Sequence, residues 1–331
     1  GDSAVASGVD TFAIGFGAAA TGNFAMTFGR GGAAGTNSTV LGRGTTGSSA
    51  SDSLASGLSV VTSINSAALG ISYASGADSF AAAITENTSS YGATGSNSVA
   101  MGRRAKATNT YSVAIGNEAT SSGLSSVAIG DDAASSGSRS VALGNQATAI
   151  GTNSYALSAY GRAEKAYSAT LFGARASSTV QGKAAYGPAY LVSPGQVQGG
   201  MLVCTVQTTD GTASVLTTTN GSASTTNQVI LPNNSAYAFS GTIIARQQAA
   251  DGSNYASWEI KGALLRDANA ASTVLGNGIV NKLFATAGAS AWAIALTADT
   301  TNGGLKVEAT GAAATDIRWV ATVNTSEVTY A

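Results

Sequence analysis

A repeat of fourteen residues limits most strongly how this chain can fold. The phrase SVAIG and its close variants end on Gly102, Gly116, Gly130 and Gly144, each fourteen residues after the last. Further copies end at intervals of thirteen to fifteen residues upstream and one residue out of register downstream, at Gly15, Gly29, Gly42, Gly57, Gly70 and Gly173. Such a period indicates a stack of small similar units.

Each unit divides into two halves. The half with Val127 and Ile129 alternates apolar side chains with a period of two, and the other half has Ala133 and Ser135 at the same spacing. A second glycine lies halfway through most units, at Gly8, Gly22, Gly35, Gly123, Gly137 and Gly151. We expect the glycines to supply the backbone angles of two corners, so that each unit is one turn of a parallel β-solenoid, stacked at about 4.8 Å.

One such turn is too small to be stable alone, because its Ala, Ser and single Val or Ile residues bury little apolar surface against the entropy of ordering the chain. We therefore expect several chains around one axis, most simply three. Ala114, Ala128 and Ala142 point to the opposite face from the Val and Ile residues and are predicted to pack against the other chains.

The segment from Asn97 to Ser158 resembles the head repeats of YadA-like trimeric adhesins. The resemblance rests on the string NSVAMGRRAKATNTYSVAIGNEATSSGLSSVAIG and its continuation. The resemblance implies a left-handed parallel β-roll in a homotrimer. Upstream of residue 97 the match is looser, and the marker glycine is missing around Ile84 and Thr85.

The period ends after the stretch YLVSPGQVQGG, and longer alternating runs begin. They include AYAFSGTIIA, ASWEIKGALL, AWAIALTAD, GLKVEAT and DIRWVATV, separated by turn sequences such as DG, PNN and NGG. This pattern is typical of an antiparallel sandwich or jelly roll. The predicted fold is all-β: a β-roll shaft over residues 1–185, a junction over 186–199 and a C-terminal β-sandwich over 200–331.

The alternation also predicts which side chains fill the sandwich. Trp258, Trp292 and Trp319 all fall on the apolar face of a run. The single cysteine, Cys204, lies on the same face as Leu202 and is predicted to be a buried thiol.

Most of residues 195–331 resemble the C-terminal domain found on phage tail fibre proteins downstream of such repeats. The resemblance rests on NQVILPNNSAYAFSGTIIARQQAADGSNYASWEIKGALLRD and on the later strings AWAIALTADTTNGGLKVEATG and IRWVATVNTSEV. It implies a virion fibre.

Composition excludes several classes of function. Sixteen basic and seventeen acidic residues give no charge surplus for binding nucleic acid. The chain has no histidine, which removes Ser-His-Asp and Cys-His pairs and imidazole metal ligands. No apolar run reaches membrane-spanning length, so no membrane insertion is expected. We predict no cofactor, no metal and no enzymatic activity.

An enzyme here would depend on carboxylates. The adjacent Asp131 and Asp132 would diverge on a strand and are predicted to lie in a solvated turn. A glycosidase pair would have to come from the scattered acids of the second half, which are Glu259, Asp267, Glu308 and Asp316. A tailspike-like glycan depolymerase is therefore the least favoured alternative.

Candidate receptor contacts occur in both halves. Arg103, Arg104 and Lys106 would form a basic belt around a trimer, suited to an anionic glycan. Tyr255 takes the face opposite Trp258 and follows the loop that ends at Asn254, so these two residues, with the loops NGSASTTN and DTTNGG, are the predicted contact patch.

The predicted function is a structural and receptor-binding segment of a trimeric phage tail fibre. Its expected partners are a host cell-surface glycan or protein and an upstream tail anchor, and its expected location is the virion. The alternative is the passenger of a bacterial trimeric surface adhesin at the cell surface. Weak contacts multiplied over several copies would give the attachment its strength.

Overall fold

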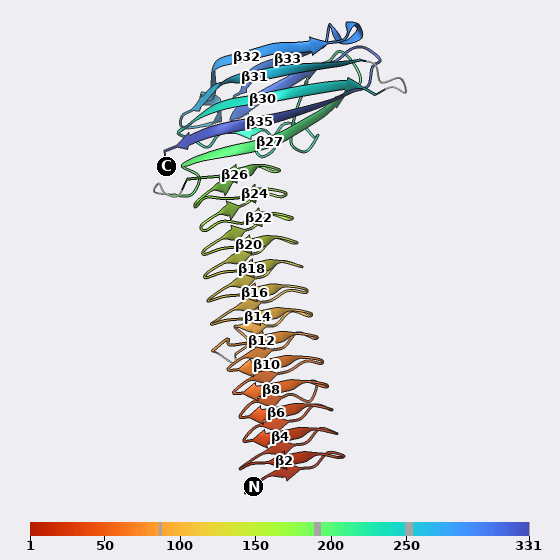
Figure 1. The fold of residues 1–331 in the computed structure, drawn as a ribbon, viewed down its shortest axis with the longest axis vertical. Coiled ribbons are helices and arrows are strands. Elements are labelled where there is room, and N and C mark those ends of the chain that lie inside the picture. The colour runs from red at the N-terminus through yellow and green to blue at the C-terminus, as the bar shows by residue number, and fades with distance from the viewer. Residues whose placement is uncertain (86–87, 189–192, 249–253, 331) are drawn as a thin grey trace. The chain divides into compact units, whose positions relative to one another are not determined.

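The computed structural model describes residues 1–85, 88–188, 193–248 and 254–330. The chain is all-β: a parallel β-solenoid of about 13 turns is followed by antiparallel sheets (Figure 1). By contacts it divides into two compact units, Gly1–Ala159 and Tyr160–Ala331. Within the described residues, no helix is long and apolar enough to cross a membrane.

Every repeat of the first unit contributes two short strands, as the sequence predicted. The longer strands form one parallel sheet and carry even numbers: β2 (Phe12–Ile14), β4 (Met26–Gly29), β6 (Thr39–Gly42), β8 (Leu54–Gly57), β10 (Ala67–Gly70), β12 (Phe80–Ala82), β14 (Val99–Met101), β16 (Val113–Ile115), β18 (Val127–Ile129), β20 (Val141–Leu143) and β22 (Tyr155–Ala156). Equivalent residues pair between turns, for example Val113 with Val127 and Ala114 with Ala128.

The second strand of each repeat has two residues and stacks in a second parallel sheet. These odd-numbered strands are β1 (Val5–Ala6), β3 (Ala19–Ala20), β5 (Gly32–Ala33), β7 (Thr45–Thr46), β9 (Val60–Val61), β11 (Tyr73–Ala74), β13 (Gly92–Ala93), β15 (Lys106–Ala107), β17 (Thr120–Ser121), β19 (Ala134–Ser135) and β21 (Thr148–Ala149). The irregular stretch between β12 and β13 does not break the stack, because β12 still pairs with β14 and β11 with β13.

The alanines of the even-numbered strands face the inside of their own solenoid. Ala114, Ala128 and Ala142 are fully buried within the single chain. The prediction that they pack against other chains is therefore wrong. The positions between the two sheets of the roll are filled mostly by Ala and Ser, with Val40, Val61 and Thr46 also buried there, and most of the larger Val and Ile side chains take the outer face.

The corners use glycine in two different ways. The glycines that end the SVAIG phrase have left-handed backbone angles, such as φ 135° at Gly116 and 137° at Gly130, as predicted. The halfway glycines do not. Near Gly123 the left-handed angle is taken by Ser125, at φ 54°, while Gly123 is needed for space: a Cβ there would lie 2.0 Å from the carbonyl oxygen of Gly137.

A serine precedes most of the even-numbered strands and fills the inside of a corner. Ser126 and Ser140 donate their hydroxyl hydrogens to the carbonyl oxygens of Gly123 and Gly137, at 2.8 and 2.7 Å. Both are fully buried. The repeated serine therefore satisfies a backbone oxygen that the tight corner removes from water.

The second unit begins with the last parallel turns, which are β23 (Arg162–Ala163), β24 (Ala169–Thr170), β25 (Ser177–Ser178) and β26 (Ala184–Tyr186). Strand β26 then pairs antiparallel with β27 (Val197–Thr208), the first long strand. Parallel pairing thus changes to antiparallel pairing within one continuous sheet.

Two antiparallel sheets form the sandwich of the second unit. The first has the order β27, β35 (Ile317–Thr329), β30 (Ser235–Gln247), β31 (Tyr255–Arg266) and β32 (Val274–Ala285). In the second, β34 (Gly304–Thr310) pairs with β33 (Ala293–Asp299) on one side and with β28 (Ser214–Val215) and β29 (Val229–Ile230) on the other. Two 3-10 turns, η1 (Ala270–Ser272) and η2 (Ala287–Ala289), occur in the connections.

The sandwich core is built around the three tryptophans, as predicted. The ring of Trp319 contacts those of Trp258 and Trp292, with centroids 5.4 and 5.8 Å apart. Cys204 is buried beside Leu202, and burial raises the pKa of its thiol to about 12. The cysteine is therefore a core residue, held as the unreactive thiol.

Candidate functional site

One face of the solenoid in the first unit is apolar along its length. The outward positions of the even-numbered strands hold large apolar side chains, exposed at Phe12, Ile14, Met26, Phe28, Leu41, Met101, Ile129, Leu143 and Tyr155 and half-buried at Val99, Val113, Ile115, Val127 and Val141. Because residues of successive turns pair in register, these side chains form two columns, which are continuous from β14 to β20 and are interrupted upstream by smaller residues such as Thr39 and Ser56. We call this surface the apolar face.

The outward positions of the odd-numbered strands are different. There the chain places mostly small or polar residues, such as Thr45, Lys106, Thr120, Ala134 and Thr148, with larger apolar side chains at Val5, Val60 and Tyr73. Continuous exposed apolar surface of this length marks a contact with another macromolecule. The even-numbered strands present more large apolar side chains than the odd-numbered strands do.

The structure brings the three predicted basic residues together and supplies them with partners. The guanidinium groups of Arg103 and Arg104 lie 3.0 and 3.5 Å from one carboxylate oxygen of Glu118. The cations of Arg104 and Lys106 also stand over the ring of Tyr91, at 5.9 and 5.4 Å. Because the ion pairs are exposed, they contribute little to stability, and the Glu118 carboxylate offsets part of the positive charge of the patch.

Sequence reasoning did not find Glu118 as part of this patch. Glu118 stands fourteen residues after Arg104, which places it directly on the next turn. The repeat period was the signal that could have identified it.

Tyr255 and Asn254 occupy neighbouring but different environments. Tyr255 is exposed and its ring stacks on that of Phe284, with centroids 5.0 Å apart. The side-chain amide of Asn254 is engaged within the protein: its nitrogen donates to Gln247 Oε1 at 2.8 Å, and its oxygen accepts from Thr286 Oγ1 at 3.0 Å. Tyr255 with Phe284 thus forms an accessible aromatic platform, and Asn254 holds the end of its strand.

The two candidate loops are shaped by internal hydrogen bonds. In NGSASTTN, the buried Asn227 donates to Thr219 Oγ1 and to the carbonyl oxygen of Ser222. In DTTNGG, the carboxylate of Asp299 accepts from Asn302 and from Gln228. The predicted loop before Asn254 lies mostly outside the described residues.

Asp299 is held as a carboxylate. Its burial alone would raise its pKa, but the hydrogen bonds from the Asn302 and Gln228 amides and from the Asn302 backbone, with the charge of Lys306, outweigh burial and lower the pKa below its ordinary value. The carboxylate therefore closes the β33–β34 turn and is not free to bind a ligand.

Two of the acids considered for catalysis, Glu259 and Glu308, lie on the outer faces of different sheets. Glu259 lies on the outward face of the first sheet, since its neighbours Trp258 and Ile260 point inward. Glu308 lies on the outward face of the other sheet, between the buried Val307 and Ala309. Asp131 and Asp132 are exposed in a turn, as predicted. Among the described residues, no group of three Cys, Asp or Glu side chains could hold a metal ion.

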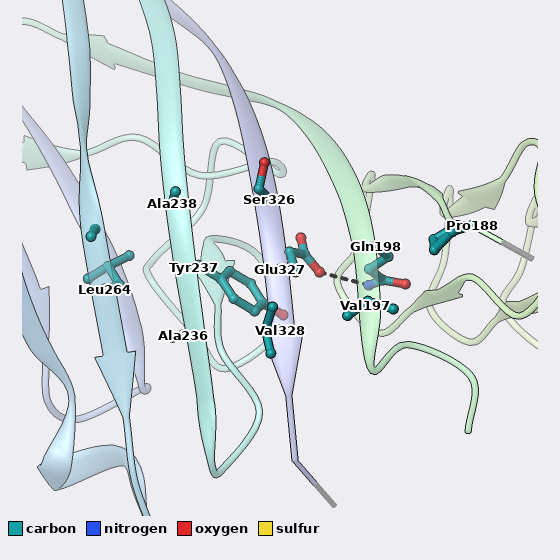
Figure 2. A pocket seen from close by; sticks show the side chains of 11 residues that line it. Pro188, Val197, Gln198, Ala236, Tyr237, Ala238, Leu264, Ser326, Glu327 and Val328 are labelled. Carbon is teal, nitrogen blue, oxygen red and sulfur yellow. Dashed lines mark hydrogen bonds between the residues drawn. The ribbon is translucent and has the colours of Figure 1, made fainter. Parts of the chain in front are cut away.

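A buried polar cluster joins the last parallel turns of the second unit to its first sheet. The Lys183 ammonium lies 2.6 Å from Glu327 Oε2, and both side chains are almost completely buried. The Gln198 amide nitrogen donates to the same oxygen at 2.7 Å (Figure 2). Burial and the Glu327 carboxylate raise the pKa of the nearby Tyr237 phenol well above its ordinary value.

A shallow apolar hollow adjoins this cluster. Its volume is about 580 Å³, and Gln198, Tyr237 and Glu327 are among the residues that line it (Figure 2). Small side chains of β30, β31 and β35 make up much of the remaining lining, at Ala236, Ala238, Ala263 and Ser326. The cluster was not predicted, because its members come from separate strands with no common spacing in the sequence.

Comparison with known proteins identifies a family whose repeats are similar to those of this chain. The model of the YadA head domain repeat matches residues 1–30, 93–119 and 121–147, which is less than half of the chain. No curated protein matches the chain. The solenoid therefore contains repeats similar to those of YadA heads.

Among solved structures, the chain is similar to a tailspike protein from Acinetobacter baumannii bacteriophage Fri1, which is a capsular polysaccharide depolymerase. The identity is 10%, and the similarity covers 96% of this chain and 69% of that chain. The TM-score is 0.23, which is too low for an argument about fold or function.

Proposed function

We propose that this chain is a structural and receptor-binding segment of a homotrimeric phage tail fibre. In this proposal three solenoids pack through their apolar faces into a rigid shaft. The antiparallel domain then contacts a glycan or protein on the host cell surface, and the segment performs no reaction of its own on the receptor.

The apolar face is the observation that supports the proposal most directly. Complete burial of one Val, Leu or Ile side chain stabilises an assembly by about 1.5–3 kcal/mol. Each turn from β14 to β20 presents two such columns, so the gain grows with every turn. Three chains, as opposed to two, follow from the resemblance of the repeats to trimeric adhesin heads.

A bacterial surface adhesin is the second candidate. The matched YadA head repeats favour it as strongly as they favour a fibre. The phage assignment rests on the resemblance of residues 195–331 to tail fibre C-terminal domains. In both candidates the solenoids form the same shaft and the chain binds a receptor outside the particle or cell. The candidates differ only in whether a phage particle or a bacterial cell carries the chain.

The trimer is tested by introducing charge into the apolar face. We expect the unmodified chain to have the mass of three chains in light scattering. Ile115→Glu combined with Ile129→Glu places two carboxylates per chain in the proposed interface, and is expected to yield single chains because burying unpaired charges is costly. Thr148→Glu, on the opposite face, is the matched control and should leave the trimer intact. A single-chain mass for the unmodified protein would refute the proposed shaft.

Receptor binding is tested on purified host envelope polysaccharide and on whole cells. A flat aromatic ring matches the apolar face of a sugar, so Tyr255→Ala is expected to weaken binding about tenfold. Tyr167→Ala removes a ring that is more exposed than that of Tyr255 from a solenoid turn, and should bind as the unmodified chain does. Equal binding by both variants would exclude the Tyr255 platform as the contact.

A further inference from the structure

The buried polar cluster places an amine and an amide on either side of one carboxylate, and both contact it. Lys183 directly precedes β26, Gln198 lies on β27 and Glu327 lies on β35. One oxygen of Glu327 accepts hydrogen bonds from both the lysine Nζ and the glutamine Nε2. The lysine amine and the glutamine amide nitrogen therefore share one proton acceptor.

The amide of Gln198 is also held in a fixed orientation. Its carbonyl oxygen accepts from the backbone N–H of Ser177 at 2.8 Å, and its nitrogen donates to the Ser177 carbonyl oxygen at 2.9 Å. A backbone N–H aimed at the carbonyl oxygen would stabilise negative charge developing there during attack on the amide carbon.

The chain leaves room for these groups and excludes water from them. Gly200 lies beneath them: a Cβ at this position would come within 2.6 Å of Lys183 Cε and of Glu327 Oε1. The ring of Tyr237 covers the ammonium at 5.7 Å. The ion pair is enclosed in this way, so the Lys183 amine lies beside a carboxylate that can serve as its proton acceptor.

We propose that Lys183 and Gln198 form an intramolecular isopeptide bond, with Glu327 as the proton relay. Glu327 takes one proton from the Lys183 ammonium, and the neutral Nζ attacks Cδ of Gln198. The bond from Cδ to Nε2 breaks as Glu327 returns that proton to the leaving nitrogen, which departs as ammonia. Glu327 takes the second proton that Nζ loses and ends as the neutral acid.

Atoms and charge balance in this reaction without an oxidant or any other reactant. An ion pair and an amide become a secondary amide, a neutral carboxylic acid and ammonia. The products leave no uncompensated charge in the buried cluster, which would otherwise be costly. The adjoining hollow offers the ammonia a way out.

The two nitrogens lie 2.6 and 2.7 Å from the same Glu327 oxygen, so the amine and the amide are held as neighbours in one enclosed site. Fixing two reacting groups side by side replaces a slow encounter with an effectively unimolecular step, worth an effective concentration of up to about 10⁵–10⁸ M. The resulting bond would tie the last parallel turn to the first long strand. Such a link would resist pulling along the chain, because that force would otherwise separate β26 from β27.

The proposal is tested by the mass of the intact, denatured chain after folding. We expect the unmodified chain to be lighter than its sequence by one molecule of ammonia. After chymotrypsin cleavage at Tyr186, the peptide with Lys183 should remain covalently attached to the peptide with Gln198. A full sequence mass, or an ammonia loss that maps to any other residue, would overturn the proposal.

Variants separate the chemistry from folding. Lys183→Arg keeps a cation beside Glu327 but removes the nucleophilic amine, and Glu327→Gln removes the proton relay, so both should have their full sequence mass. Lys261→Arg is the matched control, because Lys261 also lies near a glutamate, Glu259 at 3.9 Å, but is exposed. It should show the same ammonia loss as the unmodified chain. Circular dichroism confirms that each variant is folded, and ammonia loss by folded Lys183→Arg would refute the assigned nucleophile.

Discussion

Trp319→Ala is expected to lower the free energy of unfolding of the second unit by about 3–5 kcal/mol. Trp319 is completely buried and contacts the rings of both other tryptophans. Its indole N–H also donates to Thr208 Oγ1 at 2.9 Å, so truncation leaves a cavity and a buried hydroxyl that has lost its partner. Urea unfolding followed by circular dichroism measures the change.

Two further variants separate the contributions of apolar packing and of the hydrogen bond to this loss of stability. Trp319→Phe keeps most of the apolar contact but removes the hydrogen bond, and should cost clearly less than the alanine variant. Tyr330→Ala removes an aromatic ring that is 77% exposed and should leave stability nearly unchanged. If Trp319→Ala cost no more than Tyr330→Ala, the tryptophan cluster would not be the centre of the core.

The solenoid could be predicted from the sequence because its contacts repeat. Residues fourteen apart pair between turns, so the period alone determines the strand register. Alternation defines two faces of each strand but does not say which face is inside. We assigned Ala128 to the outside, as is usual when Val and Ile are available for a core. In this narrow roll the preference is largely reversed, because Ala and Ser fill most inward positions and valine takes few of them, such as Val40 and Val61.

The buried polar cluster could not be predicted by the same reasoning. Glu327 is 144 residues from Lys183 and 129 from Gln198. These residues meet only because β35 pairs with β27, and β27 with β26. Alternation identifies inward-facing positions on each strand but not the order of strands in a sheet. A buried charge on one strand therefore gives no sign of its partner on another.

Gly123→Ala is expected to destabilise the solenoid by about 1–3 kcal/mol, the usual cost of overpacking. The added methyl group would lie 2.0 Å from the carbonyl oxygen of Gly137 on the next turn. That oxygen belongs to the backbone, so the conflict can be relieved only by separating two turns of the stack. Thermal and urea unfolding by circular dichroism, on chains of equal concentration, measure the loss.

Gly47→Ala is the matched control within the same solenoid. Its backbone lies outside the left-handed region, and the nearest atom to an added Cβ is 3.7 Å away. Alanine there should be neutral or should stabilise by up to about 1 kcal/mol, because it restricts only the unfolded chain. Equal losses at both positions would mean that glycine is required for flexibility throughout the solenoid. A loss confined to Gly123 would show that the spacing between turns, and not the freedom of the backbone, selects glycine at the halfway corner.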